Sequence, residues 1–152
     1  MKKTMRLTSL AAVCLALSSS GCGGSSPTGP GPGPTPETFR GSTVFDDDSS
    51  SVFPSFSIDV RGSGTLDASL TWTVAAPGTG RFGGNAPELL INLIDPCSGG
   101  VFDCPIRQSR PRATPPVTLS APVERGTYSL VLTSARLCGG CRVDYTLTVM
   151  HP

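Results

Sequence analysis

Alternation of apolar and polar residues is the feature of this chain that most constrains its fold. In residues 65–74 the apolar side chains Leu66, Ala68, Leu70 and Trp72 are separated by Asp, Ser and Thr. A period of two is typical of a β-strand with one buried and one solvated face. The pattern recurs in four further segments, which are residues 56–60, 117–123, 128–133 and 143–149.

Residues 89–94 (LLINLI) are instead apolar almost throughout. This run predicts a strand covered on both faces, or a central strand beneath a loop. No stretch beyond the N-terminal segment has a helical apolar period, and Gly or Pro interrupts nearly every interval. Seven or eight short strands split by turns predict an all-β fold, a single antiparallel β-sandwich of the jelly-roll-like kind. We expect Trp72 and Tyr145 to be core residues rather than ligand platforms.

The N-terminus has the pattern of an export signal. Three basic residues, an apolar run over residues 7–17 and a few small residues precede Cys22. The apolar run is too short to span a bilayer as a mature helix. An ordinary secretory signal followed by a chance cysteine is one interpretation of this pattern.

The stretch from Leu17 to Cys22 also resembles the bacterial lipoprotein signal, in which the cysteine after a small-residue cleavage site is acylated and becomes the N-terminus. Gly21 and Cys22 fit that pattern, whereas Ser19 stands where the family usually has Leu. The resemblance implies a signal peptide over residues 1–21 and lipidation of Cys22. It also implies a membrane-anchored lipoprotein of the bacterial cell envelope, facing the periplasm or the exterior.

Residues 22–37 read as a tether, because ten of these sixteen residues are Gly or Pro and none is large and apolar. Such a segment cannot bury enough surface to offset the entropy of ordering it. It would span roughly 20–24 Å as flexible coil and about 50 Å as an extended Pro-rich rod. Residues 38–152 remain for one compact domain.

The charge of residues 22–152 excludes some partners. This part of the chain carries nine arginines and no lysine against eleven acidic residues, a formal charge of −2. Nucleic-acid binding requires a basic face, and so does electrostatic adhesion to anionic lipid. We therefore expect no nucleic-acid partner and attachment to a membrane only through the lipid. We also expect a monomer.

Three stretches of the domain resemble a known family. They are GTLDASLTW (64–72), LLINLIDP (89–96), and GTYSLVLTS with VDYTLTV (126–134 and 143–149). In this order they are similar to the bacterial pre-peptidase C-terminal (PPC) domain family, small jelly-roll-like sandwiches attached to exported proteins. The resemblance implies a non-catalytic accessory domain connected with substrate binding, secretion or stability, and some members bind calcium. The chain departs from the family at Leu90 and Asn92, where acidic residues are common, and in its four domain cysteines.

Those cysteines, Cys97, Cys104, Cys138 and Cys141, are spaced C-x6-C and C-x2-C. Three interpretations compete. Exported chains meet an oxidising environment, which favours disulfides. A zinc site would prefer two short hooks, and the first spacing is too wide. A redox dithiol usually begins a helix, whereas LCGGC stands between two predicted strands. We predict two local disulfides, Cys97–Cys104 and Cys138–Cys141.

Gly139-Gly140 can form a two-residue turn, because glycine tolerates positive φ at both positions. In such a hairpin Leu132 would face Leu147, Leu130 would face Val149 and Ser134 would face Tyr145. Cys138 would then face Cys141 at about 5.5 Å, within disulfide range. The alternative geometry is a loop that passes between two sheets.

Two polar clusters are candidate sites. Asp46, Asp47 and Asp48 form the densest acidic group and could supply oxygen ligands to calcium, or could be a solvated loop. Arg107, Arg110 and Arg112 lie in a Pro-broken segment, RQSRPR, which we predict to be a loop between strands. Their guanidinium groups suit carboxylate or sulfate on a polysaccharide or protein partner, or are solvated.

Catalysis has little support in the sequence. His151 is the only histidine and stands beside the C-terminus, where we expect a frayed end. No Gly-rich loop opens a helix, so no nucleotide cofactor is expected. We expect a non-enzymatic, lipid-anchored binding or accessory module whose partner is a polysaccharide or another exported protein. The alternatives are a structural envelope lipoprotein and a small exported hydrolase.

Overall fold

The computed structural model describes residues 33–46, 53–81, 83–97 and 104–152. The predicted signal peptide, Cys22, most of the tether, Asp47 and Asp48 lie outside these ranges. Within them there is no helix, and so none that could cross a membrane. The strands are β1 (Thr35–Phe45), β2 (Ser55–Val60), β3 (Gly64–Ala76), β4 (Glu88–Ile94), β5 (Ile106–Gln108), β6 (Val117–Val123), β7 (Gly126–Arg136) and β8 (Cys141–His151).

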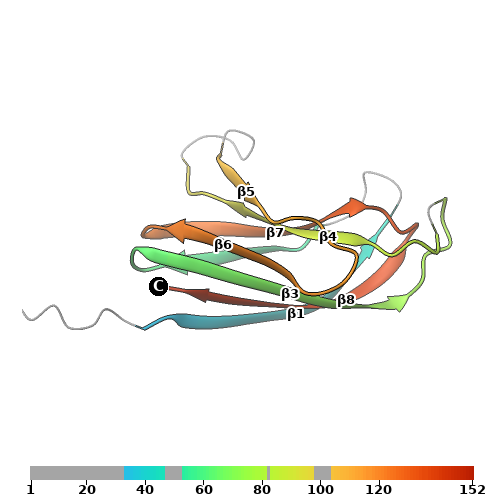
Figure 1. Cartoon of the computed structure of the whole chain (residues 1–152), viewed down its shortest axis with the longest axis horizontal. Coiled ribbons are helices and arrows are strands. Elements are labelled where there is room, and N and C mark those ends of the chain that lie inside the picture. Colours follow the sequence, from blue (N-terminus) through green and yellow to red (C-terminus); the bar gives the residue numbers. More distant parts are fainter. Residues whose placement is uncertain (1–32, 47–52, 82, 98–103) are drawn as a thin grey trace, which may run out of the picture.

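The strands form two antiparallel four-stranded sheets that run along the long axis of the molecule (Figure 1). Sheet A has the order β1-β8-β3-β6, and sheet B has the order β2-β7-β4-β5. Of the connections between successive strands, only β4 to β5 stays within one sheet, and the others cross to the opposite sheet. This is the jelly-roll form of the antiparallel sandwich. The predicted fold class is confirmed.

The core lies between the two sheets and is made by the alternating apolar residues. Leu66 and Leu70 of β3 and Leu147 of β8 face it from sheet A, all fully buried. Leu130 of β7 and Ile91 of β4 face it from sheet B, also fully buried. Strand β4 lies between β7 and β5, and its run of apolar residues is buried at nearly every position, as predicted for a central strand. Trp72 is 7 % exposed and belongs to the core, and Tyr145 packs against it.

Strand β1 was not indicated by the sequence. It begins at Thr35, so residues 35–37 of the predicted tether belong to the sheet. Its inward positions include a glutamate, a glycine and a threonine besides Phe39 and Phe45, so apolar alternation is weak. The strand is specified instead by its neighbour, because it pairs with β8 from Thr35 opposite His151 to Phe45 opposite Cys141.

The predicted hairpin of residues 128–149 is wrong, because its two strands do not pair, and the alternative geometry, a loop that passes between two sheets, is confirmed. Strand β7 pairs with β2 and β4 in sheet B, whereas β8 pairs with β1 and β3 in sheet A. Gly139 and Gly140 do adopt positive φ, 66° and 80°, but their turn passes from one sheet to the other. Alternation reveals which side of a strand is buried. It does not reveal whether two strands pair within one sheet or face each other across the core, because the pattern is the same in both cases.

The two ends of the sandwich differ. At the end that we call the tether end, β1 begins beside the last residues of β8, and Arg61 after β2 donates its backbone N–H to the carbonyl of Pro152. At the opposite end, which we call the turn end, the 138–141 turn meets Phe45 and the loop after β3. There Gly140 N–H donates to the Phe45 carbonyl at 3.0 Å, and Gly80 N–H donates to the Gly139 carbonyl at 2.8 Å.

Candidate functional site

The outer side of sheet A carries regular rows of hydroxyl groups. Because the odd or even positions of each strand face the core, the others face solvent together. One row crosses all four strands, with Thr38 opposite Thr148, Thr148 opposite Ser69, and Ser69 opposite Thr118. The adjacent rows add Thr146 opposite Thr71, and Ser42 and Thr73 on either side of Asp144. We call this surface the hydroxyl face: Thr38, Ser42, Ser69, Thr71, Thr73, Thr118, Thr146 and Thr148.

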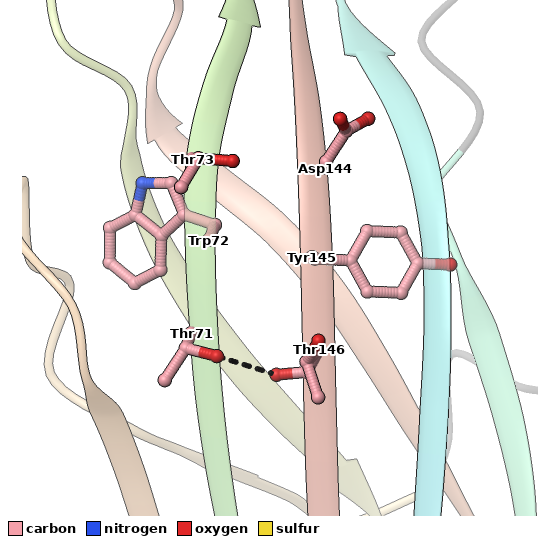
Figure 2. Close-up of a pocket in the computed structure, with 6 residues that line it drawn as sticks. All are labelled: Thr71, Trp72, Thr73, Asp144, Tyr145 and Thr146. Carbon is pink, nitrogen blue, oxygen red and sulfur yellow. Dashed lines mark hydrogen bonds between the residues drawn. The ribbon is translucent and has the colours of Figure 1, made fainter.

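A shallow hollow of about 210 Å³ lies on this face between β3 and β8, lined by residues 71–73 and 144–146 (Figure 2). The Thr71 hydroxyl donates to the backbone carbonyl of Thr146 at 3.4 Å. The aromatic rings of Trp72 and Tyr145 belong to the core side, so the outer surface of the hollow is formed by short polar side chains. This site was not predicted from the sequence. Threonine alternating with apolar residues is also typical of an ordinary solvent-exposed strand face, so the pattern does not distinguish the two.

The formal charges of the outer side of sheet A cancel. It carries Arg40, Arg142, Asp67 and Asp144 at its outward positions. Arg142 is held in place, because its Nε lies 3.6 Å from an Asp144 carboxylate oxygen and donates to the Ser42 hydroxyl at 2.9 Å. The surface is therefore polar without a net field.

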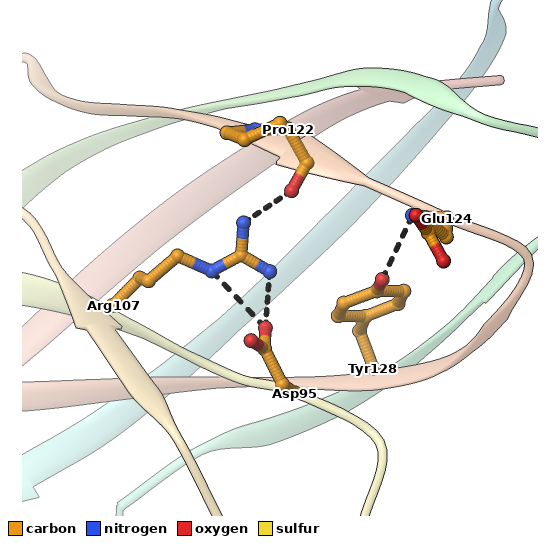
Figure 3. Close-up of polar contacts among 5 residues, drawn as sticks. All are labelled: Asp95, Arg107, Pro122, Glu124 and Tyr128. Atoms are coloured by element: carbon orange, nitrogen blue, oxygen red, sulfur yellow. Dashed lines mark hydrogen bonds and ion pairs between the residues drawn. The ribbon is translucent and has the colours of Figure 1, made fainter.

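Arg107, a candidate ligand-binding residue, makes several contacts within the molecule (Figure 3), and its role toward a ligand stays a prediction. Its Nε donates to an Asp95 carboxylate oxygen at 3.1 Å, and one terminal nitrogen contacts the same oxygen. The other terminal nitrogen donates to the backbone carbonyl of Pro122 on β6. The guanidinium also lies 5.9 Å from the centre of the Tyr128 ring. Arg107 thus connects the edge strand of sheet B to the edge strand of sheet A.

A cleft of about 510 Å³ adjoins this cluster, lined by Asp95, Pro96, Arg107, Pro122, Glu124, Arg125 and Tyr128. A second hollow of about 460 Å³ shares Asp95 and Pro96 and reaches Cys97 and Cys104. The Tyr128 hydroxyl accepts a hydrogen bond from the Glu124 backbone N–H at 3.0 Å, which fixes the ring in the wall of the cleft (Figure 3). The polar groups here bind mainly one another.

The RQSRPR segment is only in part the predicted loop. Arg107 and Gln108 belong to β5, and the segment continues along β4, where Arg112 and Leu89 exchange both backbone hydrogen bonds. Ser109 is buried, and its hydroxyl accepts from the Ile91 N–H at 2.8 Å. Arg107 lies opposite Leu93 and Arg112 opposite Leu89, four residues and about 13 Å apart along β4. The side chains of Arg110 and Arg112 are exposed, and this strand does not bring the three arginines to one point.

The acidic cluster is described only at Asp46, which follows β1 directly and is exposed. Among the residues that the structure describes, no group of three or more His, Cys, Asp or Glu side chains could hold a metal ion. The predicted calcium site therefore stays a prediction, with Asp47 and Asp48 outside the described ranges.

Both predicted disulfides are present, which confirms the pairing Cys97–Cys104 and Cys138–Cys141. Their Cα–Cα distances are 5.6 Å and 5.4 Å. The second pair is 1 % exposed or less, beneath a close backbone approach of Gly78 to Cys138 and Gly139. A β-carbon on Gly78 would collide with those backbone atoms, so glycine is required there for packing. This burial does not suit a dithiol that must be attacked by partner thiolates.

His151 does not lie at a frayed end, and this expectation was wrong. It is the last residue of β8, is 3 % exposed, and its Nε2 lies 3.0 Å from a carboxylate oxygen of Glu37 on β1. Its Nδ1 lies 3.2 Å from the Pro152 carbonyl oxygen. The two ring nitrogens thus face a carboxylate and a carbonyl, which orders the chain end and joins β8 to β1. The alternation of β8, extended to residue 151, was the signal that could have predicted this burial.

Comparison with protein-family models and with curated protein sequences found no match for this chain.

Proposed function

We propose that the chain is a bacterial lipoprotein whose β-sandwich is a non-catalytic binding module of the cell envelope. In this proposal Cys22 carries the lipid, the Gly/Pro-rich segment after it is the tether, and the sandwich contacts a polysaccharide or another exported protein. The single observation that carries the binding role is the hydroxyl face, a regularly patterned surface of sheet A that no other described residue covers. The relation to the pre-peptidase C-terminal family is part of the same proposal and rests on the sequence stretches that resemble it.

The anchor supports this role physically. Two acyl signals are needed for stable membrane attachment, since a single chain binds only marginally, and lipoprotein maturation adds several. Since β1 begins at Thr35, the tether runs from Cys22 to about Pro34 and lets the sandwich reach away from the membrane. The hydroxyl face lies along the side of the sandwich rather than at the tether end, so a membrane below the domain would leave it accessible.

Metabolic labelling tests the anchor. Cells that express the full chain are grown with a fatty-acid probe, and we expect label on the protein and recovery in the membrane fraction. The Cys22→Ala variant should lose both. A parallel variant, Cys14→Ala, changes a cysteine inside the predicted signal and should keep both.

Retention on envelope material tests the binding role. The full chain, purified in mild detergent, is incubated with isolated cell envelopes from which lipid has been extracted. We expect it to sediment with them in a saturable manner. Absence of saturable retention of the wild-type chain would refute the binding role.

A further inference from the structure

We propose that the hydroxyl face binds an extended, electrically neutral, hydroxyl-rich polysaccharide, an inference that rests on the proposed binding function and names its ligand class and surface. The face spans all four strands of sheet A. Its hydroxyl groups stand at fixed positions because the register of β1, β8, β3 and β6 places them in rows.

The spacing of the rows suits a long ligand. Neighbouring strands lie about 4.8 Å apart, and residues on one face of a strand recur about every 6.6 Å. The row formed by Thr38, Thr148, Ser69 and Thr118 therefore presents four hydroxyls over roughly 14 Å. Each hydroxyl is one donor and two acceptors, and so can bond to a sugar hydroxyl in either direction. A repeating polymer can satisfy many such groups at once.

The stiffness of these side chains favours binding. Most of the face is threonine, whose β-branched side chain has restricted χ1 rotation. Thr71 is fixed further by its contact with the Thr146 carbonyl. Since little rotamer freedom is lost when such groups engage a ligand, the entropy cost of binding is low.

The charge of the face argues for a neutral ligand. Its arginines and aspartates cancel, and Arg142 is already engaged by Asp144 and Ser42. An anionic polymer or lipid surface needs uncompensated Lys or Arg, and calcium needs several carboxylates together. A ligand without charge suits this surface, because the formal charges on the surface cancel.

A protein partner is disfavoured by the same composition. The energetic centres of protein interfaces are aromatic, Met and Arg side chains in desolvated pockets. Among the described residues, the large apolar side chains exposed on this side are Val44, 48 % exposed, and Met150, 37 % exposed. Val44 pairs opposite Arg142 and Met150 pairs opposite Asp67, so the hydroxyl rows separate them and they form no common apolar patch.

The test compares hydroxyl removal on the two sheets. The full chain in detergent is sedimented with insoluble cellulose, xylan, mannan and β-1,3-glucan, with polygalacturonate as the charged comparator. The triple variant Thr71→Val, Thr146→Val and Thr148→Val removes three hydroxyls and keeps β-branched shape. The control Thr127→Val makes the same change on the outer side of sheet B, where the Thr127 hydroxyl donates to Asp59. Thermal unfolding verifies that each variant is folded.

We expect saturable binding to at least one neutral polysaccharide, at least about tenfold weaker in the triple variant and unchanged in Thr127→Val. Binding that survives the triple change would place the ligand elsewhere and overturn the inference while leaving the proposed function in place. The inference is likewise overturned if the chain binds only polygalacturonate, only envelope protein, or envelopes but no polysaccharide of the panel. Failure to bind envelopes at all would instead refute the proposed function.

Discussion

Arg107 and His151 show how a single polar side chain can connect two strands at the edge of this sandwich. Arg107 joins β5 to β6 through Asp95 and the Pro122 carbonyl, and His151 joins β8 to β1 through Glu37. Arginine suits its position because its fork presents several donors in one plane, so one side chain can serve a carboxylate and a carbonyl together. Sequence reasoning offered a ligand contact or a solvated side chain for Arg107, since a guanidinium in a polar stretch looks the same whether its partner is internal or external.

Replacing Arg107 by Lys should destabilise the domain by about 1–3 kcal/mol, because an ammonium can serve as a point charge but cannot span Asp95 and Pro122 at once. The midpoint of urea unfolding measures the effect. Arg136→Lys is the matched control: the Arg136 side chain is 61 % exposed and has, among the described residues, one ion pair, 3.3 Å from Glu88, so its change should stay within about 0.5 kcal/mol. Equal effects of the two changes would show that Arg107 is not a structural bridge.

At the scale of the strand, β1 depends on an aromatic cluster that fills the space between the edges of the two sheets. Phe39 of β1 lies 4.7 Å from Phe56 of β2, and Phe56 lies 6.1 Å from Tyr145 of β8, between ring centroids. The Tyr145 ring reaches across β1 at Gly41, its partner in the register, where a β-carbon would collide with the phenol. The Tyr145 ring occupies the space that a side chain at position 41 would need, which explains the glycine in this edge strand.

Stability should fall at alkaline pH through Tyr145. Burial raises the pKa of this phenol above its ordinary value of 10.0. The unfolded chain therefore ionises first, so the contribution of Tyr145 is complete below about pH 10 and is lost as pH rises through the folded pKa. Urea midpoints of wild type and Tyr145→Phe are measured from pH 8 to pH 11. The midpoint of wild type should fall relative to that of Tyr145→Phe as pH rises. A difference that stays constant over this range would contradict the prediction.

The two disulfides differ in their exposure to solvent. Cys138–Cys141 lies under the loop after β3 and is buried, whereas Cys97 is exposed and Cys104 half-buried at the tether end. A thiolate must reach a sulfur to exchange with it, so access sets which bond yields first.

Mild reduction of the native protein should therefore open Cys97–Cys104 before Cys138–Cys141. Dithiothreitol treatment followed by alkylation and mass spectrometry should label Cys97 and Cys104 while the other pair stays unlabelled. In guanidinium chloride, where the chain is unfolded, all four should be labelled together. Equal labelling in the native protein would show that the turn end opens readily.

Six of the eight strands could be predicted from the sequence, whereas β1, β5 and the pairing partners of the strands could not. Residues 117–123 form a strand with the predicted bounds, and the other alternating segments lie within β2, β3, β7 and β8. Which strand joins which sheet depends on contacts between residues far apart in the chain, such as Thr35 with His151. The hydroxyl face follows from that topology, because Thr38, Ser69, Thr118 and Thr148 meet in one row only when β1, β8, β3 and β6 form one sheet.

For the molecule as a whole, the fold places the start of β1 and the end of β8 at one end of the sandwich. Thr35 and Pro152 lie at the same end, so an anchor at Cys22, as we propose, would hold the sandwich by β1 of sheet A. That strand also carries one column of the hydroxyl face, with Thr38 and Ser42. A load between the envelope ligand and the membrane would run along β1, which is held to β8 over its whole length.

Truncation from the N-terminus tests whether β1 is part of the cooperative unit. A chain of residues 33–152 should unfold at the same temperature as residues 22–152 if, as the composition of residues 22–32 predicts, they contribute no core. A chain of residues 53–152 should be unfolded by circular dichroism, because it lacks the pairing of β1 with β8 and the contact of Glu37 with His151. It also lacks Phe45, which is 1 % exposed. Loss of that side chain alone costs about 3–5 kcal/mol, out of a free energy of unfolding that is typically about 5–15 kcal/mol. Cooperative unfolding of the shorter chain at an unchanged midpoint would show that β1 is an accessory strand, and a marked loss of stability in residues 33–152 would place the tether inside the fold.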